Sequence, residues 1–172
     1  QAVRGQFGDS WYWNKPVLDK FAEVIWYSFA LGLASFILEI IIAIPAGIAA
    51  ARRQYSALDY TITVIALIGI SLPSFFFATI LKWVFSIKLG WVDLYGIVGR
   101  MHDQMSPIGQ ILDMAQHMIL PTITLSIVSI GSLMRYTRTN MLEVLNADFI
   151  RTARAKGLSE NRVINHHAFR NT

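Results

Sequence analysis

The segment VIWYSFALGLASFILEIIIAIPAGIAAA, residues 24–51, decides the fold class of this chain. It contains one charged residue, Glu39, and is longer than the roughly 20 apolar residues with which a helix crosses a bilayer. Residues 61–87 contain only the charge of Lys82, and residues 118–134 contain none. The chain is 54% hydrophobic with a mean hydropathy of +0.45, which is more apolar than a soluble domain requires. We therefore expect an all-α polytopic membrane protein with three transmembrane helices.

Charge between the predicted spans sets their orientation, because Lys and Arg accumulate in cytoplasmic loops. Residues 52–60 hold two Arg against one Asp, and residues 135–172 hold seven Lys or Arg against three acids. The lead-in 1–23 is balanced, and the loop 88–117 holds two bases against three acids. This predicts that the residue 1 side is extracytoplasmic and the residue 172 side cytoplasmic. The pI of 9.6 then reflects topology, and we expect no nucleic acid partner because aromatic residues do not interleave the basic tail.

Each predicted span contains a proline, and each carries small or polar residues at helical spacing. Pro45, Pro73 and Pro121 predict kinked transmembrane helices, since proline removes a backbone donor inside a helix. The polar residues have two interpretations that spacing alone leaves open: helix packing with side-chain hydrogen bonds, or a substrate path. The candidates for a path are Ser35, Glu39, Ser71, Ser74, Thr122, Ser126 and Ser129.

The segment DFIRTARAKGLS, residues 148–159, predicts a short amphipathic helix beyond the last span. Asp148 and Lys156 carry the charges that favour a helix N-terminus and C-terminus, and Gly157 suits the left-handed residue that ends a helix. One face carries Phe149, Ile150 and Ala153, and another carries Arg151 and Arg154. From this pattern alone, a helix that lies on anionic lipid and a helix that docks onto a protein are equally compatible.

A resemblance favours docking. The apolar bundle, the run RTARAKGLS and the later residues His167 to Asn171 resemble permease subunits of binding-protein-dependent ABC importers, in particular the peptide and nickel branch. The general family signature is Glu-Ala-Ala, three residues and Gly; Ala153 and Gly157 match it, while Arg151 and Thr152 depart from it. The resemblance implies the type I ABC importer permease fold with a cytoplasmic coupling helix. It also implies that a first helix precedes this sequence and that two helices follow it.

The same resemblance implies partners and a site. The partners are a second homologous permease subunit, two ABC ATPase subunits, an extracytoplasmic substrate-binding protein and the lipid bilayer of a prokaryotic inner membrane. We expect a non-catalytic subunit without a cofactor of its own, with ATP and Mg bound by partner subunits, because the chain lacks a phosphate-binding loop motif. The residues predicted to dock the ATPase are Asp148, Phe149, Ile150, Arg151, Ala153, Arg154, Lys156 and Gly157.

Three alternatives remain open at this point. A permease for nickel or a metal chelate belongs to the same branch, although the spacing of His102, Asp103 and His117 is not a ligand pattern and we predict no metal site. An ion-coupled secondary transporter would have to use Glu39. A membrane scaffold that transports nothing would keep the packing stripes and be indifferent to the basic helix.

Overall fold

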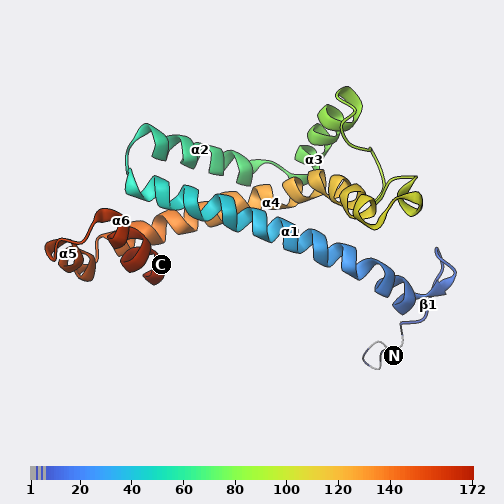
Figure 1. The fold of residues 1–172 in the computed structure, drawn as a ribbon, viewed down its shortest axis with the longest axis horizontal. Helices are drawn as coiled ribbons and strands as arrows, with labels where there is room; N and C mark the ends of the chain where they lie inside the picture. The colour runs from blue at the N-terminus through green and yellow to red at the C-terminus, as the bar shows by residue number, and fades with distance from the viewer. Residues whose placement is uncertain (1–2, 4, 6) are drawn as a thin grey trace.

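The computed structural model describes residues 3, 5 and 7–172, so positions 1, 2, 4 and 6 of the predicted lead-in lie outside it. Two long helices, α1 (Val17–Arg52) and α4 (Pro107–Leu145), run side by side along the molecule, and α2 (Ala57–Ser71) packs against both (Figure 1). The described residues form one small sheet, the hairpin of β1 (Asp9–Ser10) and β2 (Lys15–Pro16) that precedes α1. The predicted all-α class is confirmed.

Helix α1 is 36 residues long, or about 54 Å at 1.5 Å per residue, and therefore exceeds a hydrocarbon core of about 30 Å. The predicted span 24–51 lies inside it, and the helix begins seven residues earlier, after Pro16. Its buried positions are small: Ser35, Ala43, Gly47, Ala50 and Ala51. Small residues allow close approach of a neighbouring helix, and they turn toward α4 while bulky side chains remain exposed.

The expectation of one kinked helix over residues 61–87 is wrong. The segment is broken into α2 and a second body, α3 (Ser74–Lys82) with the π-helix Trp83–Lys88, and the two parts are bent by 98°. Leu72 and Pro73 between them are extended, with ψ values of 125° and 128°. Proline disfavours helical geometry in the residue before it and cannot donate to the preceding turn, so the helix stops at Ser71.

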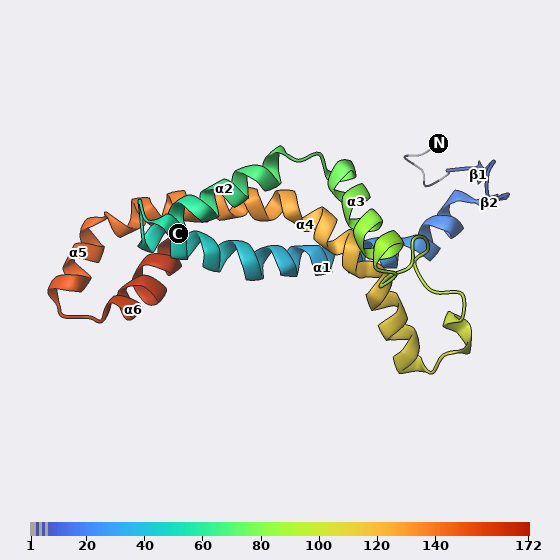
Figure 2. The same ribbon diagram turned by 90° about the horizontal axis from the view of Figure 1, so that it is seen from above.

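Helix α4 is longer than predicted. A span at 118–134 with a loop before it was expected; the structure has one helix of 39 residues from Pro107 to Leu145. The second half of the expected loop 88–117 is therefore helical. Ser106 caps this helix by accepting a hydrogen bond from the Gly109 amide at 3.2 Å. The N-terminal part of α4, yellow in Figure 2, turns away from the rest near Pro121, as a proline inside a helix favours.

Two helices of the described chain are long and apolar enough to cross a membrane, α1 and α4, and the bent pair would be a third if it counts as one span. Beyond α4, the chain continues through α5 (Asp148–Ala155), α6 (Glu160–Arg162), a π-helical turn (Val163–Ala168) and a 3-10 turn (Phe169–Asn171). These elements fold back toward the ends of α1 and α4 (Figure 1). We call this part of the molecule the α5 end, and the opposite part, with the hairpin and residues 89–117, the distal end.

Candidate functional site

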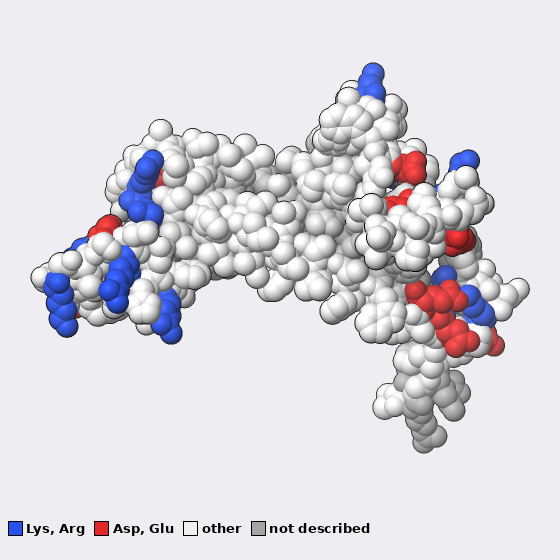
Figure 3. Space-filling model, viewed as in Figure 1, with Lys and Arg blue, Asp and Glu red and all other residues white. Residues whose placement is uncertain are grey.

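Charged side chains lie at the two ends of the molecule and are sparse between them. In Figure 3, Lys and Arg dominate the α5 end, Asp and Glu are more frequent at the distal end, and the middle is uncharged on the visible face. An apolar band between two charged ends is the surface of a protein that spans a bilayer. The basic α5 end has the composition that cytoplasmic loops favour.

Helix α5 forms over the predicted residues and stops as predicted. It spans Asp148–Ala155, and Gly157 follows with a φ of +75°, a left-handed conformation that glycine adopts without steric cost. The Leu158 amide donates back to the Ala153 carbonyl at 3.4 Å. The helix therefore has defined ends, and its faces are fixed relative to the rest of the chain.

The inner face of α5 is used by the chain itself. Ile150 is fully buried and Ala153 is 6% exposed, and both pack in a cluster with Ala51 of α1 and Met141 of α4. The other buried members come from the π-helical turn after α6: Val163, Ile164 and Ala168. Ile150 and Ala153 therefore do not provide an apolar anchor for a partner, contrary to the prediction. An amphipathic pattern cannot distinguish a face that packs internally from one that binds externally.

The outer face of α5 is free of intramolecular packing. Phe149 is 47% exposed, an unusual position for a large aromatic side chain on a basic helix. The Arg151 side chain is 74% exposed and lies 3.6 Å from the Asp148 carboxylate, an ion pair too exposed to hold it firmly. Lys156 and Gly157 are exposed at the end of the helix. These exposed residues, Asp148, Phe149, Arg151, Lys156 and Gly157, make up what we call the outer face.

Arg154 has an internal role. Its guanidinium donates two hydrogen bonds to the Glu160 carboxylate, at 3.2 Å from Nε and 2.7 Å from the second nitrogen. This bidentate pair closes the turn between α5 and α6 and lowers the pKa of Glu160, chiefly through the hydrogen bonds from Arg154. Arg154 therefore orients α5 and is not a free cation for a partner.

A buried ion pair that the sequence did not reveal ties α2 to α4 near the α5 end. The Arg138 guanidinium donates to both oxygens of Asp59, at 2.5 and 2.8 Å, and the Asp59 side chain is 3% exposed. Asp59 also accepts from the Tyr55 amide at 3.0 Å. Sequence reasoning counted both residues as loop charges. The available signal was Ser56, a helix cap three residues before Asp59, which places the carboxylate inside the first turn of a helix.

The residues predicted to line a path lie in different environments. Ser35 and Ser126 are 8% and 2% exposed, and their hydroxyls donate to backbone carbonyls, Ser35 to Leu31 at 2.8 Å and Ser126 to Ile123 at 3.2 Å. This is the packing arrangement, the first of the two interpretations. Ser71 and Ser74 are exposed beside the break after α2, and Glu39, Thr122 and Ser129 are half-buried. The structure brings Thr122 next to Ser35, whose hydroxyl lies 3.5 Å from the Thr122 carbonyl oxygen.

Glu39 lies on the packing side of α1, one helical turn from buried Ser35 and one turn from buried Ala43. Within the described part of the chain it has no ion-pair partner and no side-chain hydrogen bond. A half-buried carboxyl in an apolar helix favours a partner or a polar cavity.

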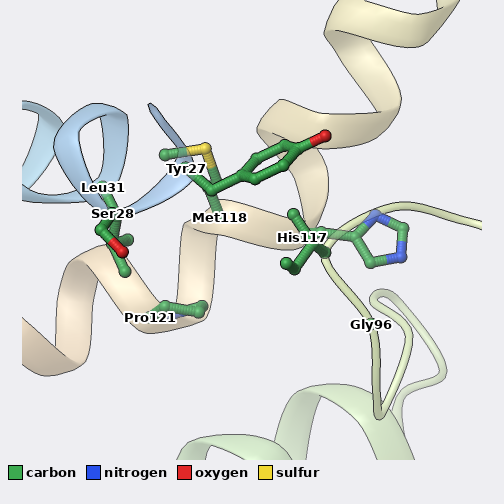
Figure 4. Close-up of a pocket in the computed structure, with 8 residues that line it drawn as sticks. Tyr27, Ser28, Leu31, Gly96, His117, Met118 and Pro121 are labelled. Carbon is green, nitrogen blue, oxygen red and sulfur yellow. The ribbon is translucent and has the colours of Figure 1, made fainter. Parts of the chain in front are cut away.

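A hollow of about 200 Å³ opens at the distal end between α1, the bend of α4 and the loop that carries Gly96. Figure 4 shows Tyr27, Ser28 and Leu31 on α1 facing Met118 and Pro121, with the His117 ring turned toward that loop. A second hollow of about 270 Å³ adjoins it on the far side of Gly96 and His117. No group of three or more metal-ligating side chains occurs among the described residues.

The long apolar helices with basic residues at one end define an α-helical integral membrane protein. The family described as "Binding-protein-dependent transport system inner membrane component" matches residues 43–172, and the chain belongs to this family. It thus has the permease fold of ABC importers that the sequence predicted.

Curated relatives with similar sequences carry names of peptide permeases. The chain is 42% identical over 170 residues to the oligopeptide transport system permease protein AppB of Bacillus subtilis, covering 98% of this chain and 52% of the relative. It is 40% identical over 171 residues to OppB of Salmonella typhimurium, covering 99% and 52%. A putative peptide permease of Brucella suis is 40% identical over 172 residues, with the same coverage. The chain thus spans about half the length of these relatives.

Proposed function

We propose that this chain forms part of the transmembrane pathway of an ATP-driven importer for dipeptides or oligopeptides. In this proposal α5 is the coupling helix, which docks on an ATPase subunit that binds ATP and Mg. A second homologous permease, a second ATPase subunit and an extracytoplasmic substrate-binding protein complete the complex. The family and the peptide permeases among the relatives support this assignment.

The observation that supports the proposal most strongly is that the two faces of α5 have different surroundings. Its inner face is buried with α1 and α4, and its outer face leaves an aromatic side chain and free cations exposed. A helix held in this way transmits displacement, because a partner that moves the outer face moves the buried cluster with it. Closure of two ATPase subunits on ATP would thereby shift the inner ends of α1 and α4 and switch the side on which the pathway opens.

The outer face has the chemistry of a docking surface. Phe149 supplies a large apolar contact, and Arg151 and Lys156 supply cations for acidic groups around a groove. Gly157 allows the turn that presents them. The α5 end then faces the cytoplasm, and the hairpin and residues 89–117 face the extracytoplasmic binding protein, the orientation that the charge distribution favours.

The test is retention of the ATPase subunit on the purified full-length permease. Phe149→Ala and Arg151→Glu should each lower ATPase retention and ATP-dependent peptide uptake at least about tenfold, because a buried aromatic or charged anchor contributes on that scale. Matched controls change the same residue types elsewhere: Phe36→Ala on α1 and Arg100→Glu at the distal end, both exposed. The controls should retain the ATPase. Equal retention by all four variants would refute the docking role of α5.

A further inference from the structure

A buried ring nitrogen without a hydrogen-bond partner lies on the wall of the second distal hollow. This space of about 270 Å³ is lined by Lys82 at the end of α3, by residues 92–96 of the loop, and by His117, Leu120 and Pro121 of α4. The His117 side chain is 5% exposed, and its Nε2 is buried without a hydrogen-bond partner in the part of the chain that the structure describes. A buried polar atom of this kind calls for a partner that the chain does not supply.

The geometry around His117 fixes which ring nitrogen carries hydrogen. Nδ1 lies 2.8 Å from the backbone carbonyl oxygen of Asp113, and a carbonyl can only accept, so Nδ1 must donate. Nε2 is then the ring nitrogen that the described residues leave without a hydrogen-bond partner. Figure 4 shows the His117 ring turned toward the loop, and His117 lines both distal hollows.

The nearest charged group to Nε2 is the Asp93 carboxylate. Asp93 Oδ2 lies 3.2 Å from Nε2, yet the two atoms are not aligned for a hydrogen bond. The Asp93 side chain is 69% exposed and lines the same hollow. An unpartnered ring nitrogen next to an exposed carboxylate suits a ligand group that carries several N–H donors and a positive charge.

A cation lines the same hollow. Lys82 is half-buried, and its Nζ lies 4.6 Å from the centre of the Tyr95 ring. None of residues 7–172 places a carboxylate within 4.0 Å of Lys82. The charged and titratable groups that line the hollow are therefore Lys82 from α3, Asp93 from the loop and His117 from α4. Asp113 contacts both His117 and His102, and Tyr27 lines the adjoining hollow.

The wall that carries Asp93 is held in place by polar contacts. Asp113 accepts hydrogen bonds from the Gly99 amide at 2.9 Å and from His102 Nδ1 at 2.7 Å. Gln116 donates to the Trp91 carbonyl at 2.8 Å. These bonds fasten both sides of the loop to one face of α4, so Asp93, His117 and Lys82 line a preformed space.

We propose that the second distal hollow, lined by Lys82, Asp93 and His117, is a binding site for the free ends of a short peptide. The peptide ammonium donates to His117 Nε2 and Asp93, and the peptide carboxylate pairs with Lys82. This inference rests on the proposed function, which supplies the peptide, and adds a site on the permease itself that recognises a zwitterion.

The test uses the full transport complex in proteoliposomes with one binding protein throughout, so that the selectivity of the binding protein cancels. The probes are trialanine, N-acetyl-trialanine and trialanine amide. Asp93→Asn should lower the uptake ratio of trialanine to its N-acetyl form about tenfold, the effect of losing a hydrogen bond to a charged group. His117→Gln should lower the same ratio, and Lys82→Met should lower the ratio of trialanine to the amide.

Asp103→Asn is the matched control, an exposed acid in the same loop that does not line the hollow, and it should leave both ratios unchanged. The site is overturned if Asp93→Asn and Lys82→Met leave the ratios unchanged, or if they lower uptake of all three probes in parallel. An intact complex that takes up none of the probes with ATP contradicts the proposed function as well. Uptake with unchanged ratios contradicts the site alone.

Discussion

The α5 end and the distal end of this molecule are held together by different forces. At the α5 end, seven residues from α1, α4, α5 and the final turns bury one another, and the enclosed Asp59–Arg138 pair joins α2 to α4. At the distal end, hollows that include those of about 200 and 270 Å³ lie between the helices and a loop, and polar contacts fix this loop to one face of α4. Close packing transmits displacement, whereas polar contacts that hold a loop around a hollow leave a preformed space for a ligand.

The comparison assigns the two ends different tasks under the proposed function. The α5 end moves as one body when a partner displaces it, and the distal end receives the peptide. Proline changes the course of the chain at the break at Leu72 and Pro73 and at the bend of α4 at Pro121, beside the distal hollows. Bends of this type are where helices change direction at small cost.

The largest expected effect concerns the Asp59–Arg138 ion pair near the α5 end. Arg138→Met leaves the Asp59 carboxyl buried without its cation, which should lower the free energy of unfolding by about 3 kcal/mol. Arg135→Met, at an exposed position three residues away, should change it little. Thermal unfolding of the purified full-length permease measures both. If the double variant Asp59→Asn with Arg138→Met is less stable than Arg138→Met alone, the pair is not the source of the loss.

The second effect concerns the seam between α1 and α4. A Cβ at Gly47 would lie 2.7 Å from the Thr137 Cβ and 2.8 Å from the Met134 carbonyl oxygen, so Gly47→Val must push the two helices apart. We expect a loss of about 2 kcal/mol in the free energy of unfolding. Gly32→Val is the matched control in the same helix, because nothing lies within 4 Å of its Cβ position. Equal thermal stability of the two variants would contradict the close approach at Gly47.

A smaller and local effect is expected at the distal loop. A Cβ at Gly99 would lie 2.7 Å from Asp113 Oδ1, a side-chain atom that can shift, so Gly99→Ala should loosen the loop without unfolding the helices. Cleavage by trypsin after Arg100 in the full-length permease should become about tenfold faster, equivalent to roughly 1 kcal/mol of local opening. The rate of cleavage after Arg154 at the α5 end should stay unchanged. Faster cleavage at both sites would show a global effect instead.

The smallest effect concerns the exposed Arg154–Glu160 pair. Because hydrogen bonds from Arg154 lower the pKa of Glu160, the pair stabilises the folded state above the ordinary pKa of a glutamate and loses this contribution as pH falls through the lowered value. Solvent screens the pair, so the contribution stays below about 1 kcal/mol. Hydrogen exchange of α5 at pH 7 should be slightly faster in Glu160→Gln than in the native chain, and the difference should shrink on acidification. A difference that grows with acid would contradict the pair.

The fold class and the limits of α5 could be predicted from sequence because each depends on local chemistry. A long apolar run has few alternatives to a membrane helix, and Asp148, Lys156 and Gly157 are each suited to one position of a short helix. The break after Ser71 was underestimated as a kink. A proline in an apolar run indicates interruption, but the 98° between α2 and α3 depends on which surfaces the two pieces pack against.

The parts that sequence did not reveal depend on contacts between distant segments. Asp59 and Arg138 are 79 residues apart, and their pairing requires the packing of α2 on α4. The same applies to Asp93 and His117, which meet because the loop folds back onto α4. Ile150 and Ala153 were correctly placed on the apolar face of α5, but the sequence could not show that Ala51 and Met141 already cover that face.

The most direct test of the docking role of α5 is cross-linking from its outer face in the intact complex. Residues 1–172 contain no cysteine, so a full-length permease freed of any others can carry a single Phe149→Cys substitution with a short thiol-to-amine cross-linker. If α5 docks on the ATPase subunit, this position should give a cross-link to that subunit, and Ala153→Cys on the inner face should give a much weaker one. Labelling of Phe149→Cys by a lipid-phase reagent, with no cross-link to the ATPase, would contradict it.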